Sequence, residues 1–140
     1  MTEIIVELAA GVLAAALVIA LFYRKGKEFL RGFFAGTLVI AALIYLAFAA
    51  AGWFAGTAGS YAFALESAGV LAFSAVAYSG WRLRAYFLSA GWLAHILWDA
   101  AAHPAGLSAY VPELYPGFCI GFDFVFGAFI VYYFYLAKRA

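Results

Sequence analysis

A chain of 140 residues that is 69% hydrophobic and only 11% charged is too apolar for a water-soluble domain, in which apolar residues make up about half. Its net charge of +1 gives no reason to expect a nucleic-acid partner. The single cysteine, Cys119, excludes an intrachain disulfide and a cysteine-rich metal cluster. We therefore expect a protein whose main partner is the lipid bilayer.

Five apolar segments are long enough, or nearly so, to cross a hydrocarbon core about 30 Å thick at a helical rise of about 1.5 Å per residue. They are residues 4–23, 33–54, 61–81, 86–102 and 118–136, and the fourth is the shortest. Backbone polar groups in lipid must pair within their own segment, so each segment should be a helix. The sequence predicts an all-α fold: a single domain over 1–140 that forms a bundle of five transmembrane helices.

The basic residues test this count independently, because cytoplasmic loops collect Lys and Arg. Four lie between the first two spans, two between the third and fourth, and two after the fifth: Arg24, Lys25, Lys27, Arg31, Arg82, Arg84, Lys138 and Arg139. Five spans place all of them on one side, with the N-terminus outside and the C-terminus cytoplasmic. We expect a multi-pass protein of the plasma (inner) membrane.

Acidic residues in the first and third spans require explanation. Glu3 and Glu7 begin the first span, where a carboxylate complements the helix dipole. Glu7 is the deeper of the two, and it fits either an interfacial position or a buried site. Glu66 lies five residues below the outer end of the third span, where an unpaired acid costs a few kcal/mol. We expect Glu66 to have a partner.

The fourth span carries both histidines of the chain. His95, Asp99 and His103 are four residues apart, so they form one polar stripe on a helix. Asp123 lies five residues below the outer end of the fifth span. Glu66, His95, Asp99 and Asp123 are therefore expected in one layer of the outer leaflet, with His103 at its mouth. Ionisable groups at such depth usually face the bundle interior and mark a functional site.

Between the fourth and fifth spans, the connection at 103–117 contains three prolines, and Glu113 is its only charged residue. Its apolar side chains include Tyr110 and Tyr115. It could form a lid over the acidic layer. The alternative is a proline-stiffened connector whose tyrosines lie in an aromatic belt at the membrane surface.

Imidazole and carboxylate ligands suit zinc, or iron and manganese where more oxygens join. The candidate metal ligands are His95, Asp99, His103, Asp123 and Glu66, and the candidate catalytic residues are Asp99, His95 and Asp123. Bound water could be activated to hydrolyse a lipid-like substrate that enters from the outer leaflet, with a spare carboxylate as general base. Haem is not expected from one chain, because both histidines lie on one stripe.

Two other interpretations remain open, and the sequence does not decide whether the protein is an enzyme. A buried His and Asp pair could fix helix packing in a non-catalytic subunit of a larger membrane complex, or in a homo-oligomer. The same groups could bind a proton or metal ion during transport. The inner halves of the spans weigh against transport, since they carry few polar residues beyond Ser74, Ser79 and Ser89.

A pattern runs from Gly91 to Asp123: Gly91-Trp92, His95, Trp98-Asp99, His103-Pro104, Cys119 and Asp123. It resembles an uncharacterised family of small prokaryotic integral-membrane proteins, which carry Trp-Asp, then a His-His pair, then Cys and Asp four residues apart. Ala102 stands here where the first histidine of that pair would be. The resemblance implies a membrane protein and no particular activity. A looser similarity, in residue types alone, is to alkaline-ceramidase-like hydrolases, which use Ser, Asp and His around zinc and have seven spans.

Overall fold

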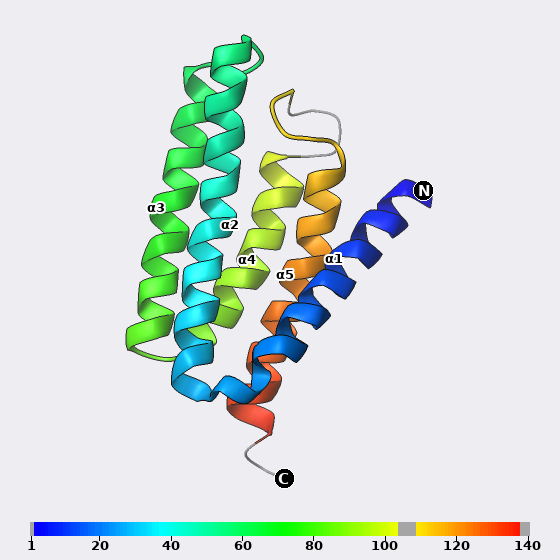
Figure 1. Ribbon diagram of the computed structural model, residues 1–140. Coiled ribbons are helices and arrows are strands. Elements are labelled where there is room, and N and C mark those ends of the chain that lie inside the picture. Colours follow the sequence, from blue (N-terminus) through cyan, green and yellow to red (C-terminus); the bar gives the residue numbers. More distant parts are fainter. Residues whose placement is uncertain (1, 104–108, 138–140) are drawn as a thin grey trace.

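A computed structural model describes residues 2–103 and 109–137. Its five long helices are α1 (Thr2–Phe22), α2 (Lys27–Ala55), α3 (Ser60–Arg82), α4 (Tyr86–Ala102) and α5 (Leu114–Val131) (Figure 1). A 3-10 turn, η1 (Tyr23–Lys25), follows α1, and a π-helical turn, η2 (Tyr132–Leu136), follows α5. These two ranges contain no strand, so the all-α prediction is confirmed for them.

Each predicted span lies on one helix or on a helix and the turn that follows it, but two helices begin at least four residues earlier than hydropathy predicts. α2 begins at Lys27 rather than at 33, and α5 begins at Leu114 rather than at 118. Charged residues and a proline lower the hydropathy of these ends without preventing a helix. Pro116 lies in the first turn of α5, where the N–H that proline lacks would have no intrahelical partner.

Within the described ranges, four helical segments are long and apolar enough to cross a membrane: α1 with η1, α2, α3, and α5 with η2. The fifth helix, α4, has 17 residues. Large apolar side chains point outward from the bundle, and Leu13 and Phe54, for example, are 70% and 90% exposed. A surface covered by such side chains suits lipid rather than water. These features fit a multi-pass membrane protein.

The helices alternate in direction, so that the start of α1 and η2 lie at opposite ends of the bundle (Figure 1). α1 packs against α5, α5 against α4, α4 against α3 and less extensively α2, and α2 against α3. The contact between α1 and α5 depends on glycine, since a Cβ on Gly11 would overlap the backbone of Phe118 and one on Gly121 that of Leu8. Small residues allow this close approach of helix backbones.

The two ends of the bundle differ in charge. The basic end holds the α1–α2 and α3–α4 connections and every Lys and Arg within the described ranges: Arg24, Lys25, Lys27, Arg31, Arg82 and Arg84. The acidic end holds the start of α1, the α2–α3 connection and residues 109–113. Apolar side chains fill much of the interior, including Phe34, Leu38, Leu88, Trp92, Phe126 and Ile130. A second, smaller cluster contains Tyr45, Val111 and Cys119.

Candidate metal centre

Three of the predicted site residues meet between α4 and α5. The four-residue spacing of His95 and Asp99 places both on the face of α4 that packs against α5, which carries Asp123. His95 Nδ1 lies 2.8 Å from Asp123 Oδ2 and 3.5 Å from Asp99 Oδ2. One ligand atom from each residue lies within 4.8 Å of the others. The group could therefore hold a metal ion.

This group lies in the protein interior, where an isolated charge is costly. His95 and Asp99 are 0% exposed and Asp123 is 1% exposed. Within the described ranges, neither Asp99 oxygen nor His95 Nε2 has a hydrogen-bond partner. Two carboxylates this close together and out of water cannot both stay ionised unless a cation compensates them. The side chains themselves thus favour binding of a cation, either protons or a metal ion.

Glu66 and His103, the other two candidate ligands, form a separate pair. Glu66 Oε1 lies 3.0 Å from His103 Nε2, and it accepts a hydrogen bond of 2.7 Å from the Tyr110 hydroxyl. Glu66 and His103 are each 1% exposed. Burial and the bond to Glu66 raise the pKa of Tyr110 above its usual range, so this phenol stays protonated as the donor. The expected partner of Glu66 is therefore present, on the residues that follow α4.

Tyr45 on α2 lies between the two groups, and sequence reasoning missed it. Its ring stacks on His103, with centroids 4.4 Å apart and planes 12° apart, and its centroid is 5.8 Å from that of His95. The side chain is 1% exposed, and its hydroxyl has no hydrogen-bond partner among the described residues. The one signal available was its place in an otherwise apolar stretch, which also fits an aromatic residue facing lipid.

Several residues of the Gly91–Asp123 pattern bring α4 close to its neighbours. A Cβ on Gly91 would come 2.7 Å from Leu38 on α2 and 2.8 Å from Val76 on α3. The Trp98 ring lies over Gly69 of α3, where an added Cβ would be 2.9 Å from it. Close packing on both sides keeps the polar stripe of α4 inside the bundle.

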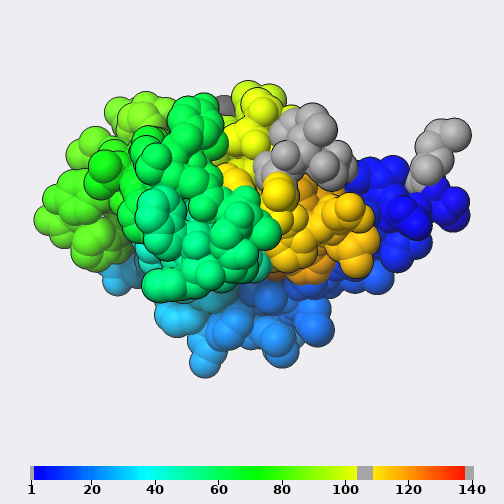
Figure 2. Space-filling model, turned by 90° about the horizontal axis from the view of Figure 1, so that it is seen from above, coloured from blue at the N-terminus to red at the C-terminus, as the bar shows by residue number. Residues whose placement is uncertain are grey.

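The structure closes the site at the acidic end. Residues 109–113 lie between the α2–α3 connection and the start of α1 (Figure 2). Val111 is buried in the cluster with Tyr45, and Tyr110 is bonded to Glu66. This part of the 103–117 connection thus covers the polar layer, while Pro104 and the other residues at 104–108 lie outside the described ranges, as do Lys138 and Arg139. A substrate would reach the site only if the covering side chains moved.

Comparison with family models, with curated proteins and with solved structures found no match to this chain. The chemistry of the site must therefore be argued from its own residues.

Proposed function

We propose that this is a five-span plasma (inner) membrane protein, with its N-terminus outside, that binds a divalent metal ion and hydrolyses a lipid-like substrate. One observation carries the proposal: His95, Asp99 and Asp123 converge in the interior, while every described Lys and Arg lies in or beside the connections of the basic end. Two carboxylates and an imidazole suit zinc, and also iron or manganese. These three residues are the proposed ligands.

A divalent ion held there would supply Lewis-acid chemistry, activating water and polarising a carbonyl or phosphoryl group. Without an ion, His95 Nδ1–H can donate to Asp123, and that proton must leave before the nitrogen can act as a ligand. Asp99 has a second carboxylate oxygen beyond the one that would hold the ion, and this oxygen would accept a proton from water as general base. Three protein ligands leave room for water and substrate, as in catalytic metal sites.

The complete burial of the three side chains supports a second candidate, a non-catalytic polar cluster in a membrane subunit. Such a cluster would fix the packing of α4 on α5 and would hold protons instead of a metal ion. Transport of protons or metal ions has less support. Apolar side chains including Phe34, Leu38 and Phe126 fill the bundle beyond the site.

Elemental analysis of the purified protein tests the proposal. We expect close to one zinc, iron or manganese ion per chain after reconstitution with each metal. Asp99→Asn and His95→Gln should lower affinity by more than the roughly 10- to 100-fold typical of losing an outer-shell partner. Glu66→Gln is the matched control: it also neutralises a buried acid, but it should keep the metal, because Glu66 pairs with His103.

A wild-type protein that binds none of these ions would refute the metal centre and favour the non-catalytic cluster. A metal-loaded protein should also release product from labelled membrane lipids, and Asp99→Asn should release none. Stoichiometric metal without product release from any lipid class would keep the metal site and refute hydrolysis.

A further inference from the structure

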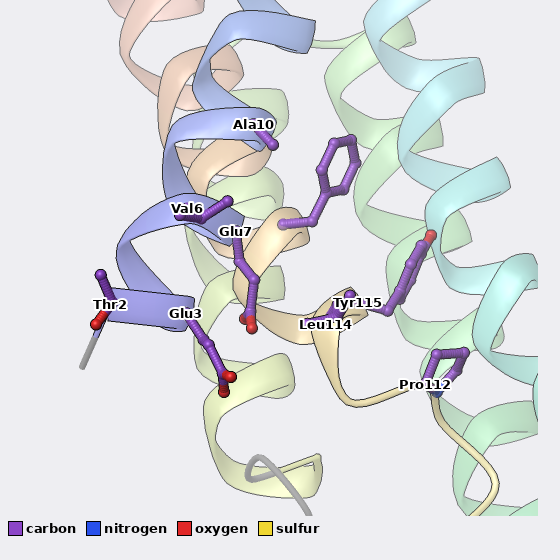
Figure 3. Close-up of a pocket in the computed structure, with 9 residues that line it drawn as sticks. Thr2, Glu3, Val6, Glu7, Ala10, Pro112, Leu114 and Tyr115 are labelled. Atoms are coloured by element: carbon purple, nitrogen blue, oxygen red, sulfur yellow. The ribbon is translucent and has the colours of Figure 1, made fainter.

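A groove of about 630 Å³ lies on the surface between the start of α1 and the start of α5 (Figure 3). Its lining is largely apolar and includes Val6, Ala10, Pro112, Leu114 and Phe118. The start of α1 lies at the rim of the bundle beside residues 109–113 (Figure 2). Such a lining suits a hydrocarbon chain.

Glu3 and Glu7 are the two charged residues of this groove. They are four residues apart on α1, and their side chains extend on the same side toward the start of the helix (Figure 3). Glu3 is exposed, and Glu7 is half-buried against the first turn of α5, where a Cβ on Gly117 would overlap its carboxylate. The described Lys and Arg residues all lie at the basic end, so none of them compensates these two carboxylates.

We propose that the groove binds a long-chain amine, with the hydrocarbon chain along the apolar lining and the ammonium group beside Glu3 and Glu7. A primary ammonium carries a positive charge, which no described side chain lining the groove supplies, and it can donate three hydrogen bonds. A phospholipid fits less well, because its phosphate would bring a further negative charge to the two carboxylates. A second copy of this chain, inserted in the membrane in the same orientation, also fits less well as the occupant. Its described Lys and Arg residues would lie at the basic end, away from Glu3 and Glu7.

Two aromatic rings connect the groove to the candidate metal centre. Tyr115 lines the groove, and its ring centroid lies 5.4 Å from that of Tyr45, which contacts both buried histidines. Tyr115 and Tyr45 thus lie between the groove and His95. Binding of the amine in the groove does not depend on the proposed function. The further step, that the bound amine is also the substrate, rests on the proposed function.

Retention of labelled amphiphiles by the immobilised, detergent-solubilised protein tests the inference. The probes are hexadecylamine, hexadecanol and phosphatidylethanolamine, each at the same mole fraction in a non-ionic detergent. We expect the amine to be retained about five-fold better than the alcohol, the upper end of what an exposed ion pair contributes. The preference should disappear in the Glu3→Gln/Glu7→Gln double variant. It should persist in Glu28→Gln, which removes an exposed carboxylate at the basic end.

Ala10→Phe, which fills the groove without a change in charge, should reduce retention of amine and alcohol alike. Equal retention of amine and alcohol by the wild type would overturn the proposal, as would a preference that survives in the double variant. Retention of phosphatidylethanolamine as strong as that of the amine would overturn the assignment to a phosphate-free amine. All measurements are made on metal-loaded and on chelator-treated protein. Failure of the metal centre appears as absent metal, whereas failure of the groove proposal appears as the lack of a preference for the amine in both preparations.

Discussion

Tyr45 is the side chain that links the two buried polar groups, because its ring stacks on His103 and lies near that of His95. Because the hydroxyl has no partner among the described residues, Tyr45→Phe should leave stability unchanged or raise it slightly. Tyr45→Leu removes the stacking on His103 and leaves a cavity, so it should cost about 1–3 kcal/mol. Thermal unfolding in detergent measures both variants. A Phe variant as unstable as the Leu variant would show that the hydroxyl makes an essential bond.

At this scale the sequence indicated the ionisable residues but not their grouping. The cost of charge in lipid was enough to single out Glu66, His95, Asp99 and Asp123. Whether Glu66 belonged with the other three depended on helix rotation and on residues after α4. Its contacts with His103 and Tyr110 join positions 37 and 44 residues away in the chain, and local periodicity carries no information on such contacts.

Among the helices, α1 is joined to the bundle through a glycine contact. A Cβ on Gly11 would meet the backbone of α5, which cannot move aside, so Gly11→Ala should destabilise the protein by about 1–3 kcal/mol. Gly36→Ala is the matched control, because nothing lies within 4 Å of its added Cβ. This control should be neutral or stabilising by up to about 1 kcal/mol.

Thermal unfolding in detergent compares the two glycine variants, and equal melting temperatures would contradict the contact. The metal content of Gly11→Ala should stay at the wild-type level, because all three proposed ligands lie on α4 and α5. Hydropathy predicted the positions of α1 and α5 in the sequence, but it did not predict that the two helices pack against each other. Glycines are frequent in this chain, so their spacing alone does not identify which helices touch.

For the whole molecule, the proposed five-span topology predicts which positions can be labelled from outside the cell. In a Cys119→Ala background, Thr57→Cys and Glu113→Cys should react with a membrane-impermeant maleimide in intact cells. Lys25→Cys and Arg84→Cys should react only after permeabilisation, because they lie at the basic end. Reaction of positions 84 and 113 from the same side would show that α4 does not cross the membrane.

The burial of Cys119, the single cysteine, suits the labelling test. Cys119 is 5% exposed, so the unmodified protein should give little background labelling even before it is replaced. The distribution of basic residues predicts an orientation, and this prediction needs no knowledge of packing. The same distribution could not predict which helix lies at the rim of the bundle, because the charges of the connections do not depend on how the helices are arranged side by side.

The packing of α1 on α5 also constrains how the protein is made. Gly11 and its neighbours on α5 are roughly 100 residues apart in the chain, which at about 5–20 residues per second separates their synthesis by about 5–20 s. During that interval α1 must wait in the membrane with its glycine face against lipid or an insertion factor. Asp123, the third proposed metal ligand, is synthesised as part of α5, the helix that α1 packs against. A nascent chain that stops after α4 can therefore neither pack its first helix against α5 nor complete the candidate metal centre.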